Sequence, residues 1–375
     1  MAIEVHNRVS DFNSYRAARV KSLFNAESGC NFDLSVDADL DFDWQIGAIV
    51  GPSGSGKTSI GRKLFGGGKV YDYSEGWHDD RPIIDDISPD GDFNKVCDVL
   101  SAVGLGSVPA WLRPFRVLSN GEQFRAGMAK MILDAEGDAV LDEFTSVVDR
   151  QIARIGTMAF QRQWRKLQGR RVVVCSPHYD ILDWLQPDWV IDTKDGTFER
   201  GWHRQRPGIE LEIHKTDGSY WKYFKPHYYL DLPMPIAAEY FVGTVDGELC
   251  CHLAVDPKFN SGAYRGTRLV TMPEWQGVGI ATRFLNWVAE YHLQGNGRKG
   301  YKLPMDFHTS HPGLCAFFRS DPKWVQVSAV THGGNKGASA RSRPDSARKR
   351  GRKGTLSGYG GHLRAIQGFR YLGER

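Results

Sequence analysis

The sequence predicts a protein of two parts, an α/β half with a partly parallel sheet and an α+β half with a mixed sheet. The 375 residues suffice for two domains of ordinary size. Residues 1–200 alternate strand-like and helix-like stretches, whereas hairpin-like stretches predominate after residue 208. We therefore expect a first domain over residues 1–200, a linker over 201–208 and a second domain over 209–375.

Composition and cysteine usage indicate a folded protein of a reducing compartment. Hydrophobic residues make up 41% of the chain and charged residues 25%, as in globular proteins. The apolar runs, such as Val172–Cys175, are too short to cross a bilayer, and the first residues lack the apolar core of a signal peptide. The six cysteines form no C-x-x-C pair, which argues against a zinc site or a disulfide framework. We therefore expect a cytoplasmic protein with no membrane partner.

The first half contains short strands, at least one helix and a terminal hairpin. The expected elements are a half-exposed strand over Phe32–Phe42, buried strands at Ile46–Val50, Ala139–Leu141 and Arg171–Cys175, a helix from Ser59 to Phe65, and a hairpin leading into the linker over Asp192–Gly208.

The stretch from Gly51 to Thr58 matches the pattern G-x-x-x-x-G-K-[ST] in full and lies between a strand and a helix. Glycines let the backbone wrap phosphate groups, so that successive N–H groups point inward. Lys57 is expected to reach the β- and γ-phosphates of ATP, and Thr58 to hold Mg²⁺. The candidate nucleotide-binding residues here are Gly51, Ser53, Gly54, Ser55, Gly56, Lys57, Thr58 and Ser59.

A second acidic motif follows a buried strand at Asp138–Glu143. Asp142 is placed to help position the magnesium ion, and Glu143 to polarise the attacking water as a general base. An apolar run that ends in Asp-Glu also describes an ordinary strand exit. Its position after Lys57 in the chain makes the catalytic interpretation the stronger one.

The stretch Leu118–Gln123 reads LSNGEQ and resembles the L-S-G-G-Q signature of ABC-type ATPases, with Asn120 in place of a glycine. In that family the signature lies at a helix N-terminus and binds the γ-phosphate held by the other subunit, which points to Ser119, Gly121 and Gln123. Asp149 in Ser146–Asp149 resembles the D-loop aspartate, and His178 resembles the catalytic switch histidine. The resemblance covers roughly residues 20–200 and implies a homodimer with composite ATP sites.

Two departures separate the chain from transporter ATPases. Only 62 residues separate Lys57 from Ser119, and no convincing glutamine loop lies between them, although Trp77–Arg81 could replace it. Because this region couples ATP to membrane domains in transporters, its reduction argues against a transporter subunit.

The second half is expected to contain two antiparallel hairpins, an amphipathic helix and two closing strands. These are the hairpins Ile209–Tyr223 and Glu239–Val255, the helix Ile280–Tyr291, and the strands Trp324–Val330 and Phe369–Leu372. A Gly/Ser/Arg-rich loop over 333–361 separates the closing strands.

The turn before the amphipathic helix resembles motif A of GNAT acyltransferases, Q/R-x-x-G-x-G/A, matched by Gln276, Gly279 and Ala281. Small residues at a helix N-terminus expose backbone N–H groups that bind the pyrophosphate of coenzyme A. The candidate acyl-CoA residues are Gln276, Gly277, Val278, Gly279, Ile280 and Ala281. The resemblance covers roughly residues 209–375 and implies acetyl-CoA or a related acyl-CoA as donor.

The acid of this acyltransferase is not evident, because Phe317 and Phe318 stand where the family often has a tyrosine. Residue chemistry alone nominates His308, Ser310, His311, Cys315 and Tyr264, each of which also suits a structural role.

The basic charge of the chain is local. The segment Lys336–Lys353 contains eight basic residues and one acid, so its net +7 leaves −3 for the rest of a chain that totals +4. A flexible basic loop suits contact with the phosphates of DNA or RNA, whereas the alternative is a solubilising loop.

Together the motifs resemble fusions of an ABC-type ATPase with a GNAT domain. That resemblance implies an ATP-gated acyltransferase, and the basic loop favours nucleic acid as its acceptor, as in base modification. The alternatives are a nucleotide-switched DNA or RNA clamp with a degenerate GNAT-like module, a protein or small-amine acetyltransferase, and a transporter ATPase with an unusual partner.

Overall fold

The computed structural model describes residues 2–7, 14–24, 32–65, 69–134, 137–202, 208–228, 234–235, 237–258, 262–330 and 365–374. Its contacts divide the chain into two compact units. The first comprises residues 1–89 and 114–207, and the second comprises residues 90–113 and 208–375. The expected division at a single boundary near residue 200 is therefore incomplete. Residues 90–113 lie within the first half of the sequence but belong to the second unit.

The first unit contains a six-stranded sheet of order β4-β5-β6-β3-β7-β8. The first five strands in this order are parallel, and β8 pairs antiparallel with β7 as the expected hairpin. Strand β3 is buried along its whole length, which explains its continuous apolar sequence. The strands are β4 (Lys69–Tyr71), β5 (Asp138–Leu141), β6 (Arg171–Ser176), β3 (Ile46–Val50), β7 (Trp189–Asp192) and β8 (Thr197–Arg200).

A two-stranded antiparallel sheet of β1 (Ala2–Asn7) and β2 (Phe32–Asp37) adds to the core of this unit through Ile3, Val5 and Val36. The strand expected over Phe32–Phe42 therefore ends at Asp37. The helical elements of the unit are α1 (Tyr15–Phe24), α2 (Lys57–Leu64), α3 (Ile83–Asp86), η1 (Phe115–Val117), α6 (Asn120–Asp134), α7 (Arg150–Trp164) and α8 (Ile181–Leu185).

The second unit contains a seven-stranded sheet of order β14-β15-β13-β12-β11-β10-β9. Among its described strands, β12 and β13 form the one parallel pair, so the sheet is mixed as expected. The last two strands pair antiparallel, which confirms the expected closing strands. The strands are β9 (Glu212–Thr216), β10 (Glu239–Val245), β11 (Glu248–Lys258), β12 (Ala263–Thr271), β13 (Met305–Thr309), β14 (Trp324–Val330) and β15 (Ile366–Tyr371).

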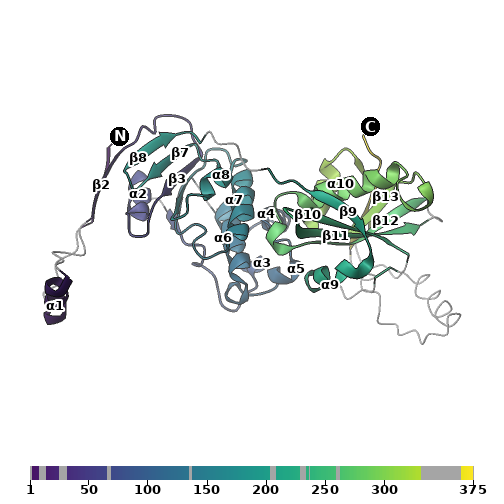
Figure 1. The fold of residues 1–375 in the computed structure, drawn as a ribbon, viewed down its shortest axis with the longest axis horizontal. Coiled ribbons are helices and arrows are strands. Elements are labelled where there is room, and N and C mark those ends of the chain that lie inside the picture. Colours follow the sequence, from purple (N-terminus) through teal and green to yellow (C-terminus); the bar gives the residue numbers. More distant parts are fainter. Residues whose placement is uncertain are drawn as a thin grey trace. The chain divides into compact units, whose positions relative to one another are not determined.

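Helices cover both faces of this sheet (Figure 1). Helix α10 (Ile280–Leu293) lies on one face, where Phe241 contacts Trp287 and Tyr291. Helix α9 (Trp221–Phe224) lies on the other face, where Phe224 packs with Val242. The remaining described helices of the unit are α4 (Phe93–Ala102), α5 (Val108–Trp111) and α11 (Pro312–Ser320), with short 3₁₀ turns η2 (Gly218–Tyr220), η3 (Lys225–His227), η5 (Pro273–Trp275) and η6 (Arg298–Gly300).

The hairpin expected over Ile209–Tyr223 is wrong. Only β9 forms there, and it pairs with β10. The Asp217 carboxylate accepts a hydrogen bond from the N–H of Ser219, 2.9 Å away, and this cap starts a helical turn instead of a returning strand. The rings of Trp221 and Phe224 then lie 5.1 and 5.3 Å from the ring of His252 on the sheet.

Among the residues that the structure places, no helix is both long and apolar enough to span a bilayer.

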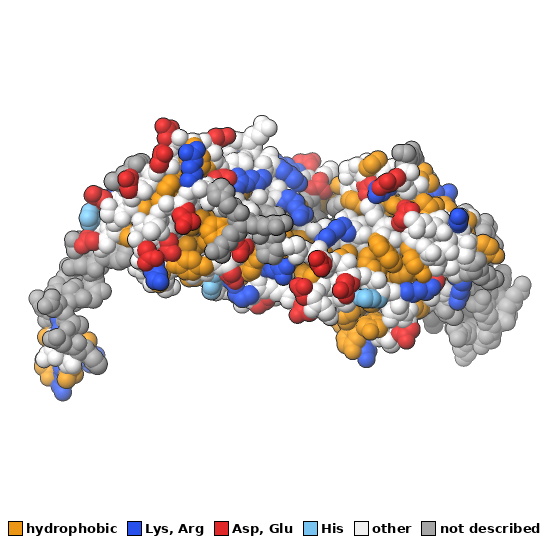
Figure 2. All heavy atoms as spheres, turned by 45° about the horizontal axis from the view of Figure 1, so that its top comes forward, with side chains coloured by type: hydrophobic (Ala, Val, Ile, Leu, Met, Phe, Trp, Pro, Cys, Tyr) orange, Lys and Arg blue, Asp and Glu red, His pale blue; other side chains and the backbone are white. Residues whose placement is uncertain are grey.

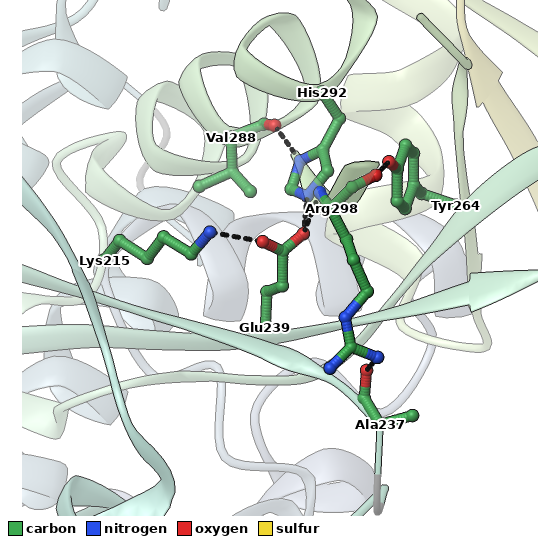
Figure 3. A network of polar contacts seen from close by, with 7 residues as sticks. All are labelled: Lys215, Ala237, Glu239, Tyr264, Val288, His292 and Arg298. Carbon is green, nitrogen blue, oxygen red and sulfur yellow. Dashed lines mark hydrogen bonds and ion pairs between the residues drawn. The ribbon is translucent and has the colours of Figure 1, made fainter. Parts of the chain in front are cut away.

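A buried polar network joins α10 to the sheet (Figure 3). The Glu239 carboxylate binds Lys215, and its Oε2 lies 3.2 Å from Nε2 of His292 and 3.1 Å from the backbone N of Arg298. The other ring nitrogen of His292 lies 2.7 Å from the Val288 carbonyl oxygen. Burial alone would raise the pKa of Glu239, but these hydrogen bonds and the Lys215 charge lower its pKa to about 2.

The first prediction concerns stability and pH. A carboxylate whose pKa is lowered on folding contributes stability above its unfolded pKa near 4.5 and loses it as pH falls toward the folded value. We expect Glu239→Gln to destabilise the second unit at pH 7. The difference from the wild type shrinks by about 2 kcal/mol between pH 6 and pH 3.

Hydrogen exchange of amides in β10 and α10 measures this difference. The matched control is Glu248→Gln, because Glu248 is exposed on β11. A pH-independent difference between wild type and Glu239→Gln would contradict the role assigned to the carboxylate.

Candidate functional site

Three chain segments of the first unit meet at one edge of its sheet. The loop Gly51–Gly56 follows β3, Asp142 follows β5, and His178 follows β6. Because β5, β6 and β3 are parallel neighbours, their carboxyl ends lie together. This edge is where ligands bind in open α/β sheets.

The loop between β3 and α2 has the conformation of an anion-binding nest. Gly54 and Gly56 have φ angles of 79° and 83°, in the left-handed region that residues with a Cβ avoid. Lys57, buried at 6% exposure, donates from Nζ to the carbonyl oxygens of Gly51 (2.9 Å) and Pro52 (2.7 Å). The ammonium thus lies against the loop, where an anion held by the N–H groups would meet it.

Thr58 and Asp142 are in direct contact. The Thr58 hydroxyl lies 2.8 and 3.0 Å from the two carboxylate oxygens of Asp142, although 84 positions separate the residues in the sequence. A hydroxyl and a carboxylate are hard oxygen donors of the kind that magnesium prefers. These two residues therefore fit the expected magnesium site.

Glu143 has a backbone conformation that its sequence did not reveal. Its φ of 48° is left-handed, as is the φ of 67° at Thr145. Non-glycine residues in this region store strain, which is often found at functional sites. The hydroxyl of Ser146 donates to the Glu143 carboxylate at 2.6 Å. The strained turn after β5 and the Ser146 hydrogen bond therefore fix the orientation of the Glu143 side chain.

His178 follows β6, and its backbone N–H donates to the Ser176 hydroxyl at 3.2 Å. Burial lowers the pKa of its imidazole, and the charge of Arg150 lowers it further. Both effects favour the neutral ring, which can accept a proton or a hydrogen bond. Asp180 and Glu143 oppose this shift with their charges.

The signature residues form a helix start. Ser119 immediately precedes α6, and both its N–H and its hydroxyl donate to Glu122 Oε2 at 2.9 Å, as in a capping box. The Gln123 amide donates to the Phe115 carbonyl at 3.1 Å, which ties the helix to the preceding turn. Asp149 caps α7 by accepting from the N–H groups of Gln151 and Ile152.

Gly121 has a packing role that the sequence did not indicate. A Cβ at this position would lie 2.7 Å from Cδ1 of Ile152 on α7. The glycine therefore permits close packing of α6 and α7.

In the second unit, the turn Gln276–Gly279 leads into α10. Gly277 and Gly279 have φ angles of 93° and 79°, and Gly279 is the N-cap. The backbone N–H groups of the first turn of a helix have no intrahelical acceptor. The expected Gln276–Ala281 loop thus has the strand–turn–helix context that a pyrophosphate site requires.

Strands β12 and β13 separate toward this loop. Their pairing runs from Tyr264 to Gly266 on β12, yet β12 continues to Thr271. A bulge against β11 falls in the same stretch, and Arg268 has a left-handed φ of 56°. The edge of β12 past Gly266 is therefore not paired with β13, a place for an extended ligand to lie between two strands.

Residues 104–106, which belong to the 90–113 part of the second unit, lie against the Gln276–Ala281 loop. The side-chain oxygen of Gln276 accepts from the N–H of Gly106 at 3.0 Å. A Cβ on Gly277 would lie 2.8 Å from the backbone nitrogen of Gly104. The candidate acyl-CoA residues thus form one loop, but the backbone of residues 104–106 packs against it.

The candidate acid and base residues of the second unit all have structural contacts. Nε2 of His311 lies 3.2 Å from the Gly106 carbonyl oxygen and Nδ1 caps α11, while burial lowers the pKa of the ring. Tyr264 donates to the Arg298 carbonyl at 3.1 Å, and Ser310 donates to Ala365. Cys315 is buried, which raises the pKa of its thiol. His308 on β13 lies beside Gly368. The geometry singles out none of them as the acid.

The expected basic loop over 333–361 lies outside the described residues, as does most of the linker over 201–208. On the face shown in Figure 2, acidic and basic side chains both occur on each unit among the described residues.

No family model matches the chain, and no curated protein matches it. Solved structures that resemble part of the chain include three from ABC proteins. A dimeric bacterial ABC transporter cassette has 14% identity and a TM-score of 0.36, covering 49% of this chain and 94% of that chain. A bacterial Atm1-family ABC exporter with ATP bound has 17% identity and a TM-score of 0.35, covering 46% and 35%. A post-hydrolysis state of the first cassette, bound to ADP and phosphate, has 14% identity and a TM-score of 0.35, covering 47% and 93%.

Proposed function

We propose that the first unit is an ATPase of the ABC type. The observation that carries this proposal is the contact of Thr58 with Asp142 beside the Lys57 loop, at the carboxyl edge of a parallel sheet. A matching sequence motif alone does not bring together a residue of helix α2 and a residue that follows strand β5 in this way. The order of the signature and D-loop motifs along the chain supports the same assignment.

In this mechanism the backbone N–H groups of residues 51–58 bind the phosphates, and Lys57 leaves the Gly51 and Pro52 carbonyls to pair with them. Thr58 and Asp142 would hold magnesium, which neutralises phosphate charge when bound. Glu143 orients the attacking water and takes its proton, and the neutral ring of His178 donates its one N–H to an oxygen of the γ-phosphate. Ser119 serves the site of a second copy, so that a homodimer completes two ATP sites.

We further propose that the second unit is an acyltransferase of the GNAT type that uses acetyl-CoA or a related acyl-CoA. Three features support this proposal: the Gln276–Ala281 turn at the start of α10, the parallel pair β12/β13, which is the one such pair among the described strands of the second unit's sheet, and the separation of that pair past Gly266. Pyrophosphate would bind the N–H groups of the turn, and the extended arm of the acyl-CoA would lie along β12. ATP binding would gate acyl transfer through the dimer.

Nucleic acid is the proposed acceptor, because Lys336–Lys353 concentrates positive charge in one segment. The packing of residues 104–106 against the Gln276–Ala281 loop favours one alternative function. In it the protein is a nucleotide-switched nucleic-acid clamp whose GNAT-like unit binds no acyl-CoA. Acyl-CoA binding separates the two proposals, and the nature of the labelled polymer separates nucleic acid from protein acceptors.

The second prediction concerns ATP hydrolysis. Glu143→Gln removes the general base but keeps the size of the side chain, so hydrolysis should fall about 10²–10⁴-fold. ATP binding should persist, and the dimer should accumulate with ATP, as measured by light scattering. Glu199→Gln, at an exposed position on β8, is the matched control. Unchanged hydrolysis in Glu143→Gln would remove Glu143 from the mechanism.

The third prediction concerns acyl transfer. Purified protein is incubated with radiolabelled acetyl-CoA and with DNA, RNA or protein fractions, with and without ATP. We expect ATP-dependent label in a nucleic-acid fraction, and loss of that label when residues 336–353 are deleted. Label confined to protein, undiminished by the deletion, would establish a lysine acceptor instead. ATPase activity without any label would support the clamp.

A further inference from the structure

We infer that the segment Ser101–Trp111 is a built-in cover that competes with acyl-CoA for the Gln276–Ala281 loop. The inference rests on the proposed acyl-CoA site and concerns its regulation. In the sequence the segment interrupts the ATPase half, yet in the structure it belongs to the second unit. Its contacts fall on the loop that the cofactor needs.

The segment contacts the Gln276–Ala281 loop directly, at Gln276 and at Gly277. The N–H of Gly106 donates to Oε1 of Gln276, while Nε2 of Gln276 donates to the Thr271 carbonyl, both at 3.0 Å. At Gly277 the backbone of residues 103–104 is so close that a Cβ would lie 2.8–3.1 Å from three of its atoms. A pyrophosphate held by the loop has to come within hydrogen-bond distance of the same backbone. Cover and cofactor would therefore compete for the space beside Gly277.

The second step is what holds the cover in place. Gly313, at the start of α11, lies so close to α4 that an added Cβ would be 2.9 Å from Cβ of Ser101. The Trp111 ring lies 5.8 Å from the His311 ring, and its indole N–H donates to the Leu105 carbonyl at 2.6 Å. His311 in turn contacts the Gly106 carbonyl. These contacts lie outside the Gln276–Ala281 loop, so they can be changed without altering the cofactor site.

The third step links the cover to ATP. Only residues 112–118 separate Trp111, the last residue of the segment, from Ser119 of the signature. When Ser119 binds the γ-phosphate of ATP held by a second copy, the short connection would transmit any displacement of Ser119 to the segment. The cover thus provides a physical route by which ATP binding would license acyl-CoA binding. While the cover is in place in most molecules, the apparent affinity for acyl-CoA equals the intrinsic affinity multiplied by the fraction of molecules in which the cover has moved away.

The experiment measures binding of coenzyme A to the full chain by calorimetry, and hydrogen exchange of the 103–111 peptide. Gly313→Ala introduces the clash with Ser101 while favouring helix α11. The double variant Ser101→Gly with Gly313→Ala removes the clash and is the matched control. Trp111→Ala loosens the cover by a different route and guards against an unfolding artefact.

We expect both loosening variants to bind coenzyme A at least about tenfold more tightly than the wild type, with faster exchange in 103–111. The double variant should return toward wild-type values. Coenzyme A added to the wild type should also speed exchange of this peptide.

Two outcomes overturn the inference separately from the proposed function. Equal coenzyme A affinity in all variants, with faster exchange in the loosened ones, would leave the acyl-CoA site standing and reject the cover. Unchanged exchange in both loosening variants would also reject the cover. No coenzyme A binding in any variant, despite faster exchange, would instead reject the acyl-CoA site and the inference with it.

Discussion

Both halves of this chain depend on the same local constraint, a left-handed glycine that ends a turn and begins a helix. Each half runs from a strand through a glycine turn into a helix, and the helix begins after a left-handed glycine. The φ angles of these glycines are nearly the same, 83° at Gly56 and 79° at Gly279. A side chain at either position would force the turn open and withdraw the N–H groups from an anion. Thr58 and Asp142 are in contact beside the first turn, and Gly106 contacts Gln276 at the second.

The turns could be predicted because their chemistry is local. A glycine pattern between a strand and a helix specifies its own geometry, and the structure confirms both contexts, together with the start of α6 at the signature. The closing strands were also predictable, because their apolar stretches are short and well separated. The motifs assigned Thr58 and Asp142 to one magnesium ion, and the order of strands in the sheet, which the sequence did not predict, brings the two residues into contact.

Other features could not be predicted, because they depend on distant partners or on backbone strain. The association of residues 90–113 with the second unit depends on contacts such as that of Gly106 with His311, 205 positions apart. The hairpin over 209–223 failed because one carboxylate, Asp217, caps a turn that the alternation pattern did not register. The left-handed conformation of Glu143 leaves no signal in residue type. The pattern of apolar residues reports burial, but not which surface provides it.

Residues 90–113 are synthesised long before the rest of the unit to which they belong. During synthesis α4 emerges with an apolar face of Val96, Cys97 and Leu100, but the helix that covers it, α11, is made more than 200 residues later. Loop closure over such a separation is slow compared with local helix formation. The nascent chain therefore carries an exposed apolar helix through most of its translation, and cellular chaperones have reason to bind it there. The same separation means that the second unit has no contiguous gene segment of its own, so a piece starting at Gly208 would lack part of its core.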